Sequence, residues 1–215
     1  MSLHHDRDVA AMRPLAAADF ERDVRGLRRL ALVVSHVLSP PVATVVAALL
    51  AARSDGSPQA YLAAGAFCLL GVLVPLAALV RQWRAGDVSD LEITRRDQRQ
   101  WPLLLTTTCV GGAAIVLQLA GAPPAAAGLA SIFGVQSLLL LLVTMSWKIS
   151  VHCAAAAAMG CLAAQFGWRP GPLLVLVVAM IWSRLHLRRH SVLQCLAGSA
   201  LGAAVMAVLW PVLGG

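Results

Sequence analysis

The amino-acid sequence predicts an all-α protein, a polytopic transmembrane helical bundle of six or seven spans. Hydrophobic residues make up 59% of the 215 residues and charged residues only 13%. The mean hydropathy of +0.77 is far from that of a soluble globular domain. The apolar residues are gathered in runs of about 20, the length that crosses the hydrocarbon core of a bilayer.

Seven apolar windows are expected to form the spans. In chain order they cover residues 30–52, 59–80, 101–119, 125–145, 150–166, 171–185 and 191–212. The stretches SDGSP, GAPP and GWRPGP, which follow the first, third and fifth windows, have the composition of turns. We expect residues 1–29 to form a cytoplasmic N-terminal segment and residues 30–215 to form the bundle.

Small side chains are expected to fill the interior of this bundle. Aromatic residues account for 5% of the chain, whereas stretches such as AAAAAMG allow helices to approach closely. The cysteines fall within the windows and show no C-x-x-C spacing, so buried reduced thiols are expected. They are Cys68, Cys109, Cys153, Cys161 and Cys195.

The basic residues are divided unequally between the two sides of the predicted bundle. The side that holds the N-terminus has 15 of the 17, and the other side has only Arg53 and Arg169. The positive-inside rule therefore places the N-terminal side in the cytoplasm of a bacterial-type cell membrane. The net charge of +7 suits an anionic membrane face or an anionic substrate.

All ten carboxylates lie between Asp6 and Asp97. A site built from the later spans must therefore be cationic, without its own carboxylate base or carboxylate metal cage. Its natural ligand is an anion, and neither a metal nor another cofactor is expected.

Two histidine patterns are candidates for binding roles. His186 and His190 are four residues apart, a spacing that can present two imidazoles to zinc, but three arginines surround them and no usual third ligand is near. His36, within SHVLSPP, suits helix packing or a polar contact, with the lining of a cavity as the alternative.

Three polar stretches precede the third, fifth and seventh windows. They read TRRDQRQWP, WKISVH and SRLHLRRH. Because odd-numbered spans all start on the same side, these stretches are expected to meet around one pocket. Lys148 is the only lysine of the chain, and its flexible ammonium suits a phosphate oxygen, with snorkelling at a span end as the alternative.

The last polar stretch carries a spaced pattern. Ser183 and Arg184 are followed by five residues, His190, three residues and Gln194, and then by LAGSALG. The pattern resembles the third signature of the type-2 phosphatidic acid phosphatase family, relatives of the vanadium haloperoxidases, in which an aspartate ends the spacing.

The other two signatures of the family are matched less fully. Ser150, Val151 and His152 resemble the Ser-Gly-His of the second signature, and Arg95, Arg96, Arg99 and Pro102 loosely echo the lysine and arginine followed by proline of the first. The resemblance covers about half of the chain, from residue 95 to residue 202.

The resemblance implies a role for each matched residue. It makes His190 the nucleophile that attacks phosphorus and His152 the general acid that protonates the leaving oxygen. The phosphate would be held by Arg184, Arg99, Arg96 and Arg95, with help from the hydroxyl or backbone of Ser150 and with Lys148 in place of the first-signature lysine.

Gln194 departs from the family pattern. Its carbonyl can accept the histidine N–H, but it cannot stabilise an imidazolium by charge. Three interpretations follow: a slower or differently tuned phosphatase, an enzyme that binds a prenyl diphosphate for other chemistry, or a non-catalytic binder. Asp97 and Glu92 lie on the same side and are candidates for the missing carboxylate.

The expected substrate is a lipid phosphate or diphosphate that enters laterally from the bilayer. An isoprenoid (di)phosphate is the first choice, because its chain suits a slim cavity lined by small side chains. Phosphatidic acid and phosphatidylglycerol phosphate are alternatives. The bilayer is the other expected partner, nucleic acid is not expected, and the oligomeric state is left open.

Overall fold

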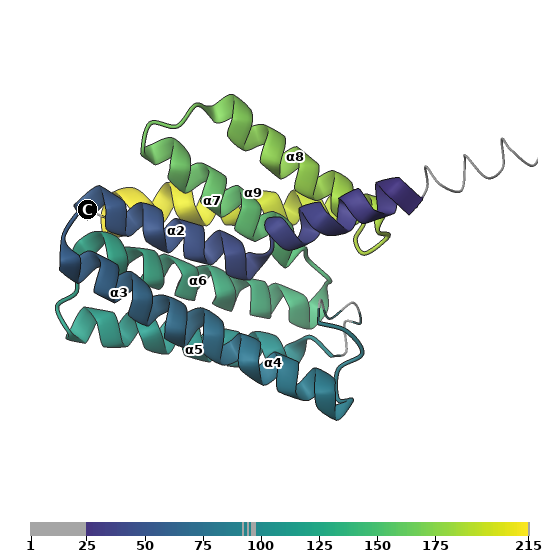
Figure 1. Ribbon diagram of the computed structural model, residues 1–215, viewed down its shortest axis with the longest axis horizontal. Coiled ribbons are helices and arrows are strands. Elements are labelled where there is room, and N and C mark those ends of the chain that lie inside the picture. The colour runs from purple at the N-terminus through teal and green to yellow at the C-terminus, as the bar shows by residue number, and fades with distance from the viewer. Residues whose placement is uncertain (1–24, 92, 94, 96–97, 215) are drawn as a thin grey trace, which may run out of the picture.

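The computed structural model describes residues 25–91, 93, 95 and 98–214, and every regular element in this part of the chain is a helix (Figure 1). The all-α prediction is confirmed; most of the expected segment 1–29 lies outside the described residues. The helices are Arg25–Val37, α2 (Pro40–Asp55), α3 (Pro58–Cys68), the π-helical η1 (Leu69–Leu73), α4 (Val74–Ala85), α5 (Gln100–Leu119), α6 (Pro124–Ser146), α7 (Val151–Gln165), α8 (Pro170–His186) and α9 (Val192–Leu213).

Within the described residues, four helices are long and apolar enough to cross a membrane. They are Pro58–Ala85, which joins α3, η1 and α4, together with α5, α6 and α9. A fifth span results if Arg25–Val37 and α2 count as one. The apolar helices α7 and α8 are shorter, with 15 and 17 residues. These findings are consistent with an integral membrane protein, but they do not confirm six or seven spans.

The first expected window is not one continuous helix. Arg25–Val37 and α2 are bent by 43° at Ser39, where Pro40 begins the second helix. Because Pro40 and Pro41 have no backbone N–H, they cannot continue the hydrogen-bond ladder of the preceding helix. The bend sends Arg25–Val37 across the end of the bundle that carries the polar stretches (Figure 1).

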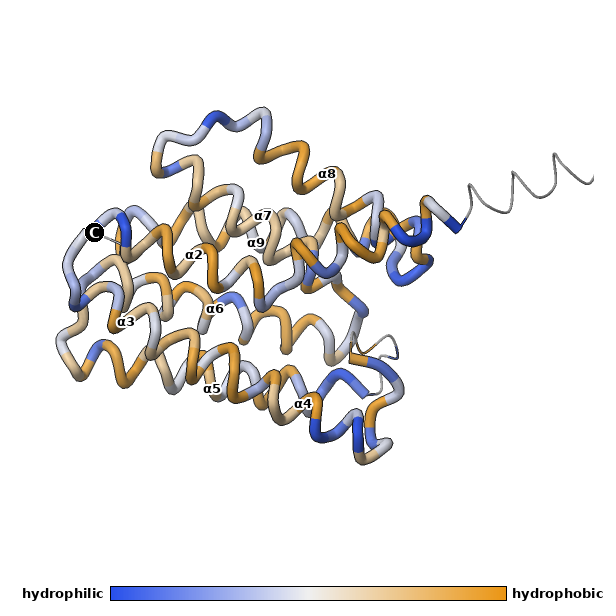
Figure 2. The backbone as a smooth tube through the Cα atoms, viewed as in Figure 1, coloured by the Kyte–Doolittle hydropathy of each residue, from blue (hydrophilic) through white to orange (hydrophobic). Residues whose placement is uncertain are grey.

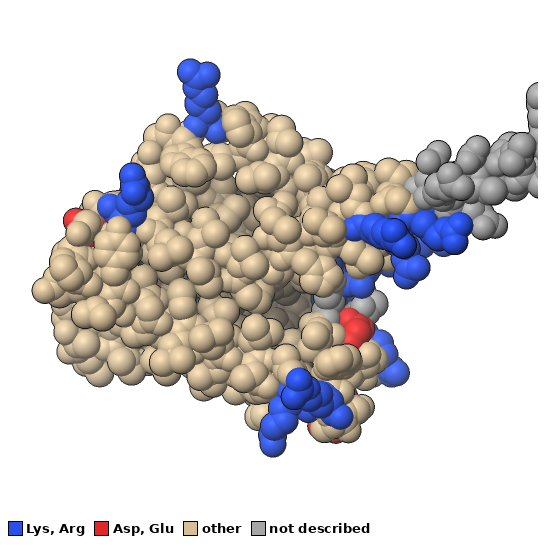
Figure 3. Space-filling view, in the orientation of Figure 1, with Lys and Arg blue, Asp and Glu red and all other residues tan. Residues whose placement is uncertain are grey.

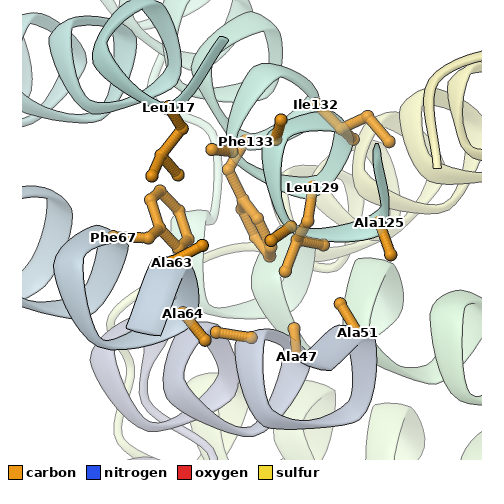
Figure 4. Packing of buried hydrophobic residues seen from close by; sticks show 14 of the residues in the cluster. Ala47, Ala51, Ala63, Ala64, Phe67, Leu117, Ala125, Leu129, Ile132 and Phe133 are labelled. Atoms are coloured by element: carbon orange, nitrogen blue, oxygen red, sulfur yellow. The ribbon is translucent and has the colours of Figure 1, made fainter. Parts of the chain in front are cut away.

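The largest buried cluster joins α2, α3, α5 and α6 and is made mainly of small side chains (Figure 4). Ala47 and Ala51 of α2 face Leu129 of α6. Phe67 and Phe133 add bulk where α3 meets α6, with ring centroids 6.2 Å apart. The alanines let the helix backbones approach closely, as the composition predicts.

A close helix approach joins α7 to α9. A Cβ atom on Gly198 would overlap the carbonyl oxygen of Ser150, and one on Gly202 would overlap that of Ala154. The two glycines are four residues apart and therefore lie on one face of α9, the arrangement of small residues that brings membrane helices together. This contact fixes the start of α7 against the first turns of α9.

All five cysteines are free. Cys153 and Cys195 are buried where α7 meets α9, as expected, whereas Cys68, Cys109 and Cys161 are only partly buried. Cys68 and Cys161 pack against the largest buried cluster. The outward surface of the helices is apolar, with Leu62 at 74% exposure and Leu119 at 84%.

The two ends of the bundle differ in polarity. Hydrophilic segments lie at the ends and apolar segments between them (Figure 2). Most basic side chains gather at the end reached by Arg25–Val37, by the α4–α5 connection and by the α8–α9 connection (Figure 3). We call this the basic end; Arg53, in the last turn of α2, and Arg169, before α8, lie exposed at the opposite end.

Candidate functional site

The three polar stretches are joined by hydrogen bonds at the basic end. The guanidinium Nη1 of Arg99 donates to the carbonyl oxygen of Ile149 at 3.4 Å. The backbone N–H of Ser150 donates to the carbonyl oxygen of Gln194 at 3.2 Å. The connections before α5, α7 and α9 therefore meet, as the alternation of the spans predicts.

Arg99 is buried in this junction, with 5% of its surface exposed. Its Nε donates to the carbonyl oxygen of Ile93 at 2.6 Å. Ile93 has a φ of 48°, a left-handed conformation that is unusual and strained for a β-branched residue. Burial, and then the charge of Arg184, lowers the pKa of Arg99 to about 10, so the guanidinium is still charged at neutral pH.

Arg184 is tied to the N-terminal helix. Its Nη1 donates to the hydroxyl of Ser35 at 2.7 Å, and the neighbouring Ser183 donates its hydroxyl to the carbonyl oxygen of Ala31 at 2.6 Å. Arg184 and Ser35 are each 1% exposed. The sequence reasoning did not include Ser35; the signal for it was a serine within an apolar run, beside His36.

His190 follows an unusual turn at the end of α8. The backbone N–H of Arg189 donates to Arg184 and that of Arg188 to Leu185, which is the Schellman arrangement. Arg188 occupies the left-handed position of this motif, with a φ of 54°, where glycine is normally found. The turn leaves His190 8% exposed beside the start of α9.

Hydrogen bonds to Gln194 define the tautomer of His190. The backbone N–H of Ser191 donates to Oε1 of Gln194 at 3.1 Å, in a capping box completed by the Ser191 hydroxyl, so this amide atom is an acceptor. Nδ1 of His190 lies 3.2 Å from the same oxygen. Nδ1 must therefore carry the proton, which leaves the lone pair on Nε2.

The imidazole of His190 is surrounded by positive charge. Burial, followed by the charges of Arg99, Arg184 and Lys148, lowers the pKa of His190 to about 3, against a smaller opposite effect of the hydrogen bond to Gln194. The ring is therefore neutral at physiological pH. A neutral imidazole with a bare Nε2 is the form of histidine that can act as a nucleophile.

Lys148 belongs to this group of cations. It lies partly buried in the connection between α6 and α7. Burial, and then the charges of Arg99 and Arg184, lowers its pKa. The charge of Lys148 also acts on His190, and its role in binding an anion stays a prediction.

The second-signature residues lie at the start of α7. Ser150 is fully buried, and its hydroxyl accepts the backbone N–H of Cys153 at 3.3 Å as the N-cap. His152 is in the first turn and partly exposed, and the charges of His190, Arg184 and Arg99 act on its ring. The structure therefore brings Ser150 and His152 to the same junction as His190.

Two candidate residues of the first signature are not placed in this junction. Arg95 is exposed in the connection between α4 and α5, in contrast to the buried Arg99. Arg96 lies outside the described residues, as do Glu92 and Asp97, the two carboxylates considered for His190.

The other histidines have local roles. His186 is exposed, and its ring stacks on Trp182 with centroids 5.4 Å apart, so it does not share the buried position of His190. Nδ1 of His36 lies 2.7 Å from the carbonyl oxygen of Leu32 in its own helix, the polar contact that was expected. The described part of the chain contains no group of three His, Cys, Asp or Glu side chains suited to a metal.

Asp90 is the carboxylate that the sequence reasoning missed. Its charge acts on Arg99, Lys148, Arg184 and Arg189. The connection before α5 contains several acids, and their positions in the sequence do not distinguish which of them turns toward the cations.

Comparisons with protein-family models, with curated proteins and with solved structures find no match for this chain. The resemblance to type-2 phosphatidic acid phosphatases therefore rests on the three short sequence stretches alone.

Proposed function

We propose that this protein is a membrane enzyme that acts on a lipid phosphate or diphosphate, and that it is an isoprenoid (di)phosphate phosphatase. One observation carries the proposal: the neutral, tautomer-defined imidazole of His190 lies among the charges of Arg99, Lys148 and Arg184. Phosphoryl transfer requires little more of a protein than a positioned nucleophile and cations for the equatorial oxygens.

In the proposed reaction, Nε2 of His190 attacks phosphorus. The P–N bond forms as the bond from phosphorus to the lipid oxygen breaks, and His152 relays a proton from water to that oxygen. Water then attacks the phosphohistidine while His152 accepts a proton from it, so the P–N bond breaks and inorganic phosphate leaves. Arg99, Arg184 and Lys148 hold the phosphate oxygens in both steps.

The surroundings of the junction suit a lipid. The outer surface of the helices is apolar. Figure 3 also shows this face hollowed beside the basic end, between Arg25–Val37 and α4. A chain lying in the bilayer would reach the cations from the side, and we assign the basic end to the cytoplasmic face on the basis of its charge.

Gln194 favours a second candidate function, the ionisation of a prenyl diphosphate as in lyases and cyclases. An amide orients His190 without stabilising an imidazolium, and ionisation needs only cations to stabilise the departing diphosphate. The lipid would then leave as a carbocation and yield a hydrocarbon or a rearranged alcohol. A binder without activity is the third interpretation.

The test is to incubate the purified protein with prenyl diphosphates and phospholipid phosphates, and to follow released phosphate and the organic product by mass spectrometry. Prenol or prenyl monophosphate supports the phosphatase. Cyclised or eliminated hydrocarbon with intact diphosphate supports ionisation. No product from any lipid leaves only a binder.

Replacement of Gln194 by a carboxylate distinguishes the two chemistries further. Gln194→Glu keeps the length of the side chain and its place in the capping box, and Gln194→Asp restores the family residue. If His190 is the nucleophile, the carboxylate stabilises its imidazolium, and phosphate release should be preserved or rise by about tenfold. If the lipid ionises, the new charge repels the departing diphosphate, and turnover should fall by a similar factor.

A further inference from the structure

The connection between α4 and α5 fastens a carboxylate beside the candidate site. The backbone N–H of Ile93 donates to the carbonyl oxygen of Asp90 at 3.0 Å, and Arg99 Nε donates to the carbonyl oxygen of Ile93. The hydroxyl of Ser89 lies 3.3 Å from Oδ2 of Asp90 and 2.8 Å from Oε1 of Gln98. Asp90 is thus connected through Ser89 to Gln98 and through Ile93 to Arg99, the two residues that precede α5.

Arg99 extends this arrangement toward the centre of the site. A second guanidinium nitrogen of Arg99, Nη1, donates to the carbonyl oxygen of Ile149, the residue after Lys148. The charge of Asp90 opposes the lowering of the pKa of both Arg99 and Lys148, which comes first from burial. From its place outside the helices, the carboxylate acts on all three cations around His190, since its charge also acts on Arg184.

We propose that Asp90 is a specificity-determining residue, the internal counter-ion that sets the preference of the site for a phosphate monoester over a diphosphate. This inference rests on the proposed function. Among the described residues, Arg99, Lys148 and Arg184 provide three positive charges around His190, and Asp90 reduces their sum to two. A monoester carries up to two negative charges at neutral pH, and a diphosphate carries more.

The expected effect follows from charge alone. Removal of the carboxylate strengthens binding of both anions, but more for the anion of higher charge. At separations of about 8 Å and an effective dielectric of about 20 to 40, one unit of charge changes the ratio of the two affinities by about fivefold to thirtyfold. Asp90→Asn should therefore shift the preference toward the diphosphate by that factor.

The experiment measures the dissociation constants of inorganic phosphate and of pyrophosphate for the purified full chain, and kcat/KM for a prenyl monophosphate and the matching diphosphate. The variants are Asp90→Asn, which removes the charge with little change of shape, and Asp90→Glu, which keeps the charge. Asp87→Asn is the matched control, because Asp87 is exposed in the same connection. Melting temperatures establish that each variant is folded.

The inference predicts that only Asp90→Asn raises the preference for pyrophosphate, while Asp90→Glu and Asp87→Asn keep the ratio of the unmodified protein. An unchanged ratio in Asp90→Asn, with both anions still bound, overturns the role of Asp90 and leaves the proposed function standing. If the unmodified protein binds neither anion and acts on neither lipid, both are overturned. A shift of equal size in Asp87→Asn would mean that net charge acts from a distance, and it would also overturn the inference.

Discussion

The two ends of the bundle use the same backbone motif for different purposes. At the opposite end, α5 and α7 terminate in Schellman arrangements with glycine in the left-handed position, Gly121 and Gly167. Proline begins the next helix in each case. At the basic end, α4 terminates in the same arrangement with Gly86 at that position, whereas α8 has Arg188 there.

The residue in the left-handed position sets the conformational cost of each turn. Glycine followed by proline gives a tight reversal at the smallest conformational cost. A left-handed arginine costs on the order of 1–2 kcal/mol, and such strain persists where the surrounding structure requires it. At the basic end the turn carries the chain from Arg184 to His190 and places both side chains in one buried junction. The strained turn is therefore specific to the α8–α9 connection that carries His190, whereas the turns at Gly86, Gly121 and Gly167 are relaxed.

The largest expected effect is that of His190→Ala. Loss of the nucleophile should lower phosphate release by at least about a thousandfold. His186→Ala is the control and should have little effect, because His186 is exposed and stacks on Trp182. Near-normal turnover of His190→Ala at saturating substrate would exclude the phosphohistidine step.

Replacement of one arginine by lysine at each end of the bundle tests whether the basic end has a special role. Arg184→Lys keeps the positive charge but loses the planar fork that matches phosphate, and kcat/KM should fall by about a hundredfold. Arg169→Lys, at the opposite end, should leave kcat/KM unchanged. Equal effects of the two variants would show that the basic end has no special role.

Relief of the strained turn should have a smaller effect. Arg188→Gly is expected to stabilise the folded protein by about 1 kcal/mol, because glycine adopts the left-handed conformation freely. Thermal unfolding in detergent measures this change. Gly167→Ala should destabilise by a similar amount at the opposite end, and a stabilising Gly167→Ala would contradict the assignment of strain.

The smallest expected effect concerns the protonation of His190, which should not change near neutral pH. With a pKa of about 3, His190 should stay neutral from pH 8 to pH 5. An unfolded histidine binds a proton below about pH 6.5, so the folded state should lose stability as the pH falls from there toward 3. Nitrogen NMR of histidine-labelled protein should show an unchanged Nδ1–H tautomer, and titration near pH 6.5 would contradict it. The spectrum of His190→Ala assigns the signal.

Local rules in the sequence predicted most of the architecture. Apolar runs, with glycine and proline between them, gave helices in the expected places, and the parity of the spans placed the three polar stretches at one end. The bend at Pro40 was marked by two prolines in the printed sequence, yet the apolar run was long enough to be taken as one span. The mean hydropathy of a window of about 20 residues is hardly changed by two prolines. The backbone hydrogen bonds of a helix, in contrast, are interrupted by them.

The site was predictable only where spacing within one stretch determines geometry. Gln194 follows His190 by four residues, across the N-cap of α9, so its role as acceptor could be expected, and the hydrogen bond confirms it. Ser35 and Asp90 come from other connections, and their positions depend on tertiary packing. Arg99 is buried in the junction and Arg95 is exposed. Which of the two is buried depends on the conformation of the chain just before α5, and local sequence propensity does not determine that conformation.

The shortness of α7 and α8 has a consequence for the surrounding membrane. At 1.5 Å per residue, helices of 15 and 17 residues reach about 22 and 25 Å, less than the roughly 30 Å of an average hydrocarbon core. α8 lies at the edge of the bundle, where it would meet lipid in a membrane (Figure 1). A bilayer adapts to short helices by thinning, so head groups near α8 would sit deeper than elsewhere, nearer to the level of His190. Local membrane thickness would then help to deliver a phosphate to the protein.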